Sequence, residues 1–231
     1  MISSNLLQAL LSPDGNIRSQ AETAFNSLSL TDRVQGLLAE LRSDSHNNDH
    51  NNNGIQMIAS VLLRRDILKM TDPNVLQQLV NPLLQAFQKQ TNNTNTSNAN
   101  IASSVGHCLA EVCASLSILG GDVDATLQTV LTHVDTKQVV SLKLLAQLAD
   151  RAPMAFAKLA VPSLPGLLSS SSGNCNDNNA ADSMMEAWAQ ILVNAGIATT
   201  VTKVELVRTP VDLDDLSADP NSPAAALGTG P

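Results

Sequence analysis

The clearest spacing among residues that could do chemistry is the pair His46 and His50. Their H-x-x-x-H spacing is one that metal sites use, and Asp44 and Asp49 lie beside it. All four residues, however, belong to the asparagine-rich stretch SDSHNNDHNNNG, which has no apolar frame to fix the geometry of metal ligands. We therefore expect a solvated loop here rather than a metal site.

A second pair is His107 beside Cys108, which could suggest a base and a nucleophile. Neighbouring residues of a helix point about 100° apart, so the imidazole and the thiol cannot meet productively. His133 stands alone near a helix end, and the sequence has no glycine-rich phosphate loop and no pair of carboxylates at a catalytic spacing. We therefore expect a protein that is not an enzyme and that needs no metal or other cofactor.

The composition favours helices. The chain has 231 residues, of which 43% are hydrophobic and only 2% aromatic, and it contains no tyrosine. Strands of a core this size usually draw on aromatic residues and dense β-branched runs, whereas this core must be built from Leu, Val, Ile, Ala and Met. The expected fold class is all-α.

Charge and cysteine content exclude several classes of protein. The 13 basic and 21 acidic residues leave a net charge of −8, and no stretch concentrates the basic ones, so we expect no direct binding of nucleic acid. Three cysteines are an odd number for a disulfide framework, and the first residues lack the positive region of a signal peptide. Because no stretch approaches the roughly 18 uninterrupted apolar residues of a membrane span, we expect no membrane insertion and a location in the cytosol or nucleus.

Segments with helical spacing come in pairs along the chain. The pairs are residues 5–11 with 16–28, 31–42 with 55–70, 73–87 with 101–119, 123–134 with 137–151, and the proline-interrupted 154–172 with 181–195. The second segments begin about forty residues apart, which is the period of HEAT repeats. One hairpin alone exposes an apolar face that stacking would cover, so we expect an α-solenoid of about five HEAT-like helical hairpins, with an ordinary helical bundle as the alternative.

Local signals indicate where several helices begin and end. Asp14 and Asp72 are placed to cap helix N-termini, and Pro73 suits a first helical position. Pro82 predicts a kink inside its helix, and Gly120 with Gly121 predicts a helix end.

The composition changes near Thr199. From Val201 onward the chain has two basic and five acidic residues, a local charge of −3, without a sustained apolar period. We therefore divide the chain into a HEAT-repeat domain at residues 1–198 and a disordered acidic tail at residues 199–231.

Two stretches resemble importin-β-like karyopherins. The stretch LLQALLSPDGNIRSQAETAFNSL is similar to the opening HEAT repeat of that family, in which an S-P-D turn precedes a helix carrying R-x-Q-A-E. The matching residues are Ser12, Pro13, Asp14, Arg18, Gln20, Ala21 and Glu22. The stretch IQMIASVLLRRDIL is similar to the second helix of the second repeat, where a Val-Leu-Leu run ends in Arg-Arg. The nearest branch is that of the large importins that carry ribosomal proteins and histones.

This resemblance implies a nuclear transport receptor with an importin N-terminal-like domain. Such a receptor binds the small GTPase Ran in its GTP form, protein cargo, with basic proteins as candidates, and the phenylalanine-glycine repeats of nucleoporins. It shuttles between cytoplasm and nucleus. The helical periodicity alone equally favours a HEAT-repeat scaffold or assembly chaperone without a role in transport.

The segment from Ile55 to Leu68 contains the candidate protein-binding residues. Its apolar residues are expected to pack against neighbouring repeats. Arg64 and Arg65 lie near the C-terminal end of the helix, where the negative end of the helix dipole stabilises cations. Gln56, Ser60 and Arg64 are four residues apart and would form a polar strip on the concave surface of a HEAT array. We predict Gln56, Ser60, Arg64 and Arg65 as binding residues.

We predict that deleting residues 201–231 leaves the folded domain intact, because that segment lacks an apolar period. The melting temperature should change by no more than about 3 °C, which corresponds to about 1 kcal/mol for a chain of this size. A thermal melt of the shortened and full chains, followed by circular dichroism, measures this difference. A much larger drop would place the segment in the core.

Overall fold

The computed structural model describes residues 2–43, 50–92, 96–135, 138–159, 186–194 and 196, and throughout this part of the chain the regular structure is helical. This confirms the all-α class for the described residues. The helices are α1 (Ser4–Leu10), α2 (Gly15–Ser27), α3 (Leu30–Arg42), α4 (His50–Ile67), α5 (Pro73–Thr91), α6 (Thr96–Leu119), α7 (Val123–His133), α8 (Val139–Arg151) and α9 (Pro153–Leu159). Residues 186–194 form a further helical segment.

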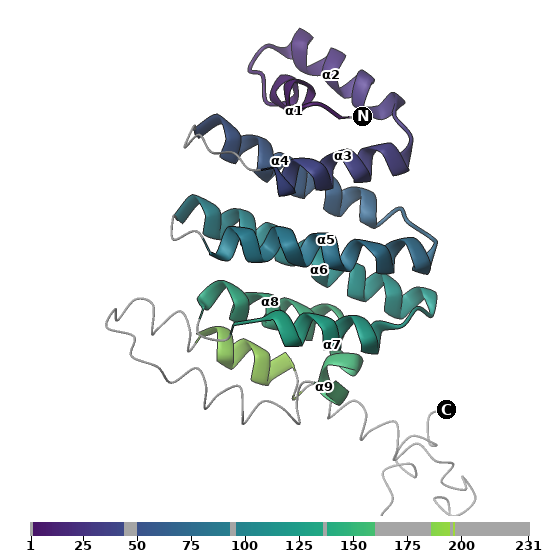
Figure 1. Cartoon of the computed structure of the whole chain (residues 1–231), viewed down its shortest axis with the longest axis vertical. Coiled ribbons are helices and arrows are strands. Elements are labelled where there is room, and N and C mark those ends of the chain that lie inside the picture. The colour runs from purple at the N-terminus through teal and green to yellow at the C-terminus, as the bar shows by residue number, and fades with distance from the viewer. Residues whose placement is uncertain are drawn as a thin grey trace, which may run out of the picture.

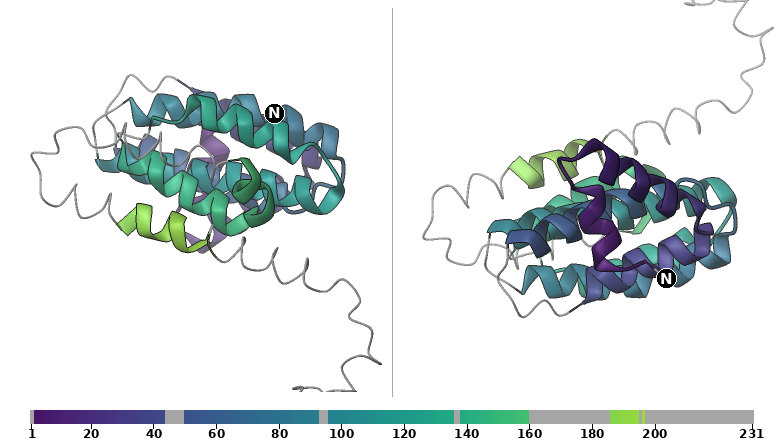
Figure 2. Two further views of the ribbon diagram at one scale, coloured as in Figure 1. Left: turned by 90° about the horizontal axis from the view of Figure 1, so that it is seen from below. Right: turned by 90° about the horizontal axis from the view of Figure 1, so that it is seen from above.

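Helices that follow one another pack in layers along the long axis of the molecule (Figure 1). Helix α3 packs on α4 and α5 on α6, while across the layers α4 packs on α6, α6 on α8, α3 on α5 and α5 on α7. The views along the stack show two rows of helices side by side (Figure 2). The hairpin of α1 and α2 lies at one end and is joined to the next layer by α1 packing on α4.

Helix beginnings follow the capping signals of the sequence. The carboxylate of Asp14 accepts the backbone N–H of Asn16 at 2.8 Å, and that of Asp72 accepts the N–H of Asn74 at 2.9 Å. Pro73 opens α5 as predicted. Each cap supplies an acceptor for an N–H group that has no partner within the helix.

Helix α6 is the centre of the core. Spacing by three and four predicts one inward stripe from Ile101 to Leu119. The stripe is buried from Ile101 to Leu116, whereas Leu119 at the end of the helix is 37% exposed, and the helix contacts α4, α5 and α8. Among the described residues, its Asn98–Leu119 stretch is the one long and apolar enough to cross a membrane, and 61% of that apolar window is buried inside the protein. Burial between other helices is what a core helix of a helical stack requires.

The structure corrects several predicted boundaries and faces. Helix α4 begins at His50 rather than Ile55, and α6 begins at Thr96, inside a polar run predicted to be a loop. Helical spacing predicts that Ile17 faces inward with Ala21 and Phe25, but Ile17 is 47% exposed, because α2 belongs to the end layer and lacks a neighbour on that side. Pro82 lies inside α5 as predicted, and the kink expected there stays a prediction.

The fifth predicted pair lies only partly within the described residues. Helix α9 ends at Leu159, and the predictions for residues 160–185 and for the tail at 199–231 fall outside the described part. Helical spacing predicts that Trp188, Ile191 and Leu192 face inward. Trp188 and Ile191 are buried, whereas Leu192 is 50% exposed.

The end of α6 depends on a glycine. Gly120 has a φ of 73°, and the N–H of Gly121 donates to the carbonyl of Leu116 at 2.9 Å, as in a Schellman motif. A side chain at Gly120 would meet no atom within 4 Å, so a substitution there perturbs only the backbone conformation.

We predict that Gly120→Ala lowers the free energy of unfolding by about 1 kcal/mol, because a left-handed conformation is costly for a residue with a Cβ. Gly120→Asn should cost less, since asparagine adopts this conformation more readily. Urea unfolding of both variants measures the difference. Equal losses for Ala and Asn would contradict a conformational cause.

Candidate protein-binding groove

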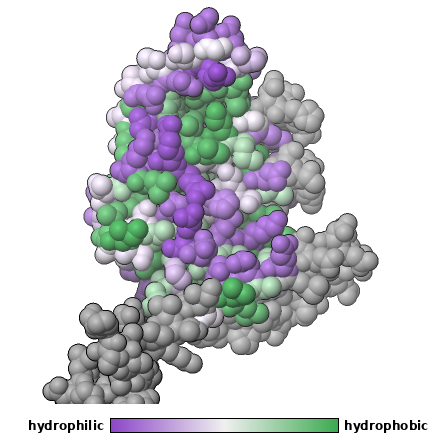
Figure 3. All heavy atoms as spheres, turned by 180° about the vertical axis from the view of Figure 1, so that it is seen from behind, coloured by the Kyte–Doolittle hydropathy of each residue, from purple (hydrophilic) through white to green (hydrophobic). Residues whose placement is uncertain are grey.

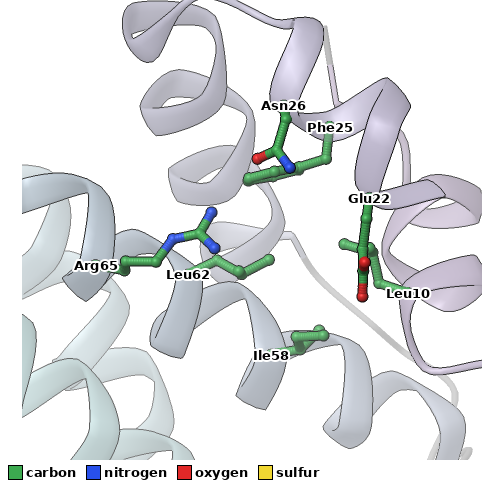
Figure 4. A pocket seen from close by; sticks show the side chains of 7 residues that line it. All are labelled: Leu10, Glu22, Phe25, Asn26, Ile58, Leu62 and Arg65. Atoms are coloured by element: carbon green, nitrogen blue, oxygen red, sulfur yellow. The ribbon is translucent and has the colours of Figure 1, made fainter. Parts of the chain in front are cut away.

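A groove lies where the first hairpin meets α4, and we name it the α2–α4 groove (Figure 4). Its volume is about 260 Å³. The residues that line it come from α1, α2 and α4, and they are Leu10, Glu22, Phe25, Asn26, Ile58, Leu62 and Arg65. Helical spacing explains the lining, because Ile58, Leu62 and Arg65 are four and three positions apart and share one face of α4.

The groove has an apolar centre and charged ends. In Figure 4 Arg65 and Glu22 lie on opposite sides, with Leu62 and Ile58 between them. Phe25 is only 2% exposed, and its ring is flanked by two guanidinium groups, with Arg33 5.5 Å and Arg65 5.6 Å from the ring centre. These are cation–π distances, so the aromatic ring holds the Arg65 side chain beside the groove.

The buried carboxylate of Asp66 holds both Arg33 and Arg65 in position. Asp66 is fully buried, and its Oδ2 lies 2.8 Å from Arg33 Nε on the neighbouring helix α3. Arg33 Nη1 also donates to the carbonyl of Leu28 at 2.9 Å. Arg65 Nε and Lys69 Nζ approach Asp66 Oδ1 at 3.7 and 3.5 Å. We name Arg33, Arg65, Asp66 and Lys69 the Asp66 cluster, and it sets the position of the last turn of α4 against α3.

The face of the molecule opposite to that seen in Figure 1 shows where these properties gather (Figure 3). Hydrophobic residues collect in the upper part of this face, at the level of α1, α2 and α4, beside a band of hydrophilic residues. Val61 of α4 and Leu68, which directly follows that helix, are 56% and 59% exposed. Apolar surface next to charge is typical of a protein-binding surface.

Two of the four predicted binding residues lie inside the protein. Gln56 is 3% exposed and accepts a hydrogen bond from Gln90 Nε2 at 3.1 Å, and Ser60 is fully buried with its Oγ 2.7 Å from that of Ser104. The predicted exposed strip is therefore wrong for Gln56 and Ser60. The face of α4 that carries them packs on α6, so these polar groups hydrogen-bond to neighbouring helices.

The two arginines differ in environment. Arg64 Nε lies 3.3 Å from Glu111 Oε2 of α6, with the arginine side chain 35% and the glutamate 7% exposed. Arg64 therefore joins α4 to α6, continuing the line of Gln56 and Ser60. Arg65 lies in the groove with 46% of its side chain exposed. A binding role for either arginine stays a prediction.

The histidine and cysteine pair has no catalytic geometry. Burial raises the pKa of the Cys108 thiol to about 12, so the sulfur stays protonated, and its S–H donates to the Ser60 carbonyl at 3.3 Å. Burial, reinforced by Arg64 and Arg151 and opposed by Glu111, lowers the pKa of His107. The Gln147 amide donates to His107 Nε2 at 3.1 Å. Each side chain thus hydrogen-bonds to a different neighbouring helix, Cys108 to α4 and His107 to α8.

Residues 44–49 of the predicted solvated loop, including His46, lie outside the described residues, as does the side chain of His50. Residues 50–54 belong to α4, so the loop prediction is wrong there. Within the described ranges, no three His, Cys, Asp or Glu side chains come together as metal ligands.

Several residues of the groove and its support were not predicted from sequence. Helical spacing places Phe25 on the inward face of α2 but indicates no partner for it, and it gives no role to Arg33, Asp66 or Glu111. For Asp66 and Glu111, however, the sequence contains a signal of a buried ion pair. Asp66 directly follows two arginines in an apolar helix, and Glu111 is the only acidic or basic residue, histidine aside, in α6. An isolated charge in an apolar helix indicates a partner on a neighbouring helix.

A second groove of about 310 Å³ lies between α8 and the 186–194 helix. It is lined by Lys143, Ala146, Gln147, Glu186, Ala187 and Gln190. None of these residues belongs to the two stretches that resemble a known family. We therefore take the α2–α4 groove as the candidate site.

Comparisons of the chain with protein families, with curated proteins and with solved structures gave no match.

We predict that Asp66→Ala lowers the free energy of unfolding by about 3 kcal/mol, because it leaves the largely buried Arg33 without its counter-charge. Asp150→Ala is the matched control, since Asp150 pairs with Arg151 at 3.7 Å but is 67% exposed. The control should cost less than about 1 kcal/mol. Equal losses in urea unfolding would show that the Asp66 cluster does not hold α3 to α4.

Proposed function

We propose that the chain is an α-solenoid of HEAT-like hairpins that acts as a nuclear transport receptor, or as a shortened member of that family, and that the α2–α4 groove binds Ran in its GTP form. The layered hairpins support the solenoid, because each layer covers the apolar face of the next.

One observation carries the proposal. The two stretches that resemble karyopherins are about thirty residues apart in the sequence, and both contribute to the same groove. The R-x-Q-A-E stretch contributes Glu22, and its helix continues to Phe25 and Asn26. The V-L-L-R-R stretch contributes Leu62 and Arg65. Three of the residues on which the resemblance depends, Glu22, Leu62 and Arg65, thus line the same groove.

The chemistry of the groove suits a protein partner. An apolar centre of aliphatic side chains with an aromatic floor can bury an apolar anchor, and Arg65 can pair with a carboxylate beside it. Protein cargo and nucleoporin repeats would bind elsewhere on the stack. The receptor would then shuttle between cytoplasm and nucleus.

We predict that the immobilised full chain retains Ran loaded with a non-hydrolysable GTP analogue and releases the GDP form, because the switch segments of a GTPase rearrange when the γ-phosphate is lost. Micromolar affinity is expected for a groove of this size. Arg65→Glu should weaken binding of the GTP form at least tenfold, as it reverses the charge beside the apolar centre.

Arg42→Glu is the matched control, because Arg42 also lies in the last turn of its helix and is exposed but is not part of the groove. It should bind as the unaltered chain does. Arg64→Glu is a poorer probe, since it would place a carboxylate against the largely buried Glu111. Equal binding of both nucleotide states, or none at high micromolar concentration with the helical fold intact, would overturn the receptor proposal and favour a HEAT-repeat scaffold.

A further inference from the structure

The last turn of α4 and the residues packed against it carry a local excess of positive charge, although the net charge of the chain is −8. Four cations lie there or against it, and two carboxylates oppose them, so the local charge is 4 − 2 = +2. The cations are Arg33, Arg64, Arg65 and Lys69, and the carboxylates are Asp66 and Glu111. Both carboxylates are buried or nearly so, whereas Arg65 and Lys69 keep 46% and 53% of their side chains exposed.

This excess lies beside an apolar surface. Arg65 borders the α2–α4 groove, and the exposed Leu68 lies directly after the end of α4. Because Glu22 lies on the opposite side of the groove, a ligand that fits must place carboxylates on the Arg65 side and aliphatic side chains next to them.

The chain itself contains one such segment. Residues 211–216 read VDLDDL, in which three carboxylates alternate with three aliphatic side chains. Beyond Arg208 the sequence has four acidic residues and no basic one. The segment thus carries negative charge opposite to that of the last turn of α4, and aliphatic side chains that suit the apolar centre of the groove.

The segment can reach the groove. The 186–194 helix is tied to α8 by a hydrogen bond from Asn194 Nδ2 to the Ala146 carbonyl at 3.3 Å, and α8, α6 and α4 pack in succession. These three steps between helices amount to about 30 Å, at 8–10 Å for each step. The fifteen residues from Gly196 to Val211 span up to about 50 Å, which leaves length for a shift along α4.

We propose that residues 211–216 bind the α2–α4 groove of their own chain as an internal ligand. Leu213 and Leu216 occupy the apolar centre, while Asp214 and Asp215 face Arg65 and Lys69. The binding of the segment does not depend on the identity of the external partner. Its consequence, competition with that partner for the groove, rests on the proposed function.

Photo-crosslinking in the full chain tests the proposal. Benzoylphenylalanine is placed at Leu213, and the crosslinked peptides are identified by mass spectrometry. We expect crosslinks within one chain to peptides of α2 and α4. The matched control places the same group at Leu227, beyond the acidic segment, and should give less than a third of that yield.

Charge reversal tests the electrostatic part. Arg65→Glu should lower the yield of the Leu213 crosslink at least threefold, while Arg42→Glu should leave it unchanged. Adding Asp214→Arg and Asp215→Arg to the Arg65→Glu chain should restore the yield, and this rescue excludes loss of the fold as the cause.

Three outcomes would overturn the proposal: crosslinks spread over the whole molecule, crosslinks concentrated on another helix, or crosslinks that join two chains and vanish on dilution. The last would assign the segment to a second copy. A Leu213 crosslink to the groove with no binding of Ran would refute the proposed function alone. Nucleotide-dependent binding of Ran without that crosslink would refute the internal ligand alone.

Discussion

The assembly of the first two layers depends on one buried carboxylate. Asp66 has no exposed surface, and a charge in that position is tolerated only because Arg33 meets it at 2.8 Å from the neighbouring helix. Arg33 in turn lies over the ring of Phe25, which belongs to the first hairpin. One ion pair therefore relates three helices, and it also sets where Arg65 emerges beside the groove.

Further along the stack, polar pairs between helices set the position of α4 against α6, as the Arg33–Asp66 ion pair does for α3 and α4. Ser60 meets Ser104, and Arg64 meets Glu111, at intervals that follow the turns of both helices. Sliding one helix past the other by a turn would leave these buried groups without partners, at a cost of about 1–3 kcal/mol for each group. Aliphatic packing alone would penalise such a shift much less, so the polar pairs specify the register of the layers.

The sequence predicted the helices far better than it predicted the site. Helical spacing and capping residues act locally, so Asp14, Asp72 and Gly120 could be assigned their roles without a structure. Whether Gln56 and Ser60 are buried or exposed depends on which face of α4 meets α6. A polar residue within an apolar helix is compatible with either a surface position or a buried hydrogen-bonded pair. The Asp66 cluster joins residues more than thirty positions apart, so its partners could not be identified from spacing.

The position of the groove at the end of the stack affects how the molecule opens. An inner layer is stabilised by neighbours on both sides, whereas the first hairpin meets only one, through α1 on α4, Ile2 against Gly36 and Phe25 among the arginines. In a stack of units that contact only their neighbours, such an end unit unfolds locally with the smallest free energy. The groove is formed by both α2 and α4, so it exists only while the first hairpin is packed on α4. Any ligand in the groove therefore stabilises this packed state. The amide hydrogens of α1 and α2 therefore exchange with solvent at a rate that reports whether the groove is filled.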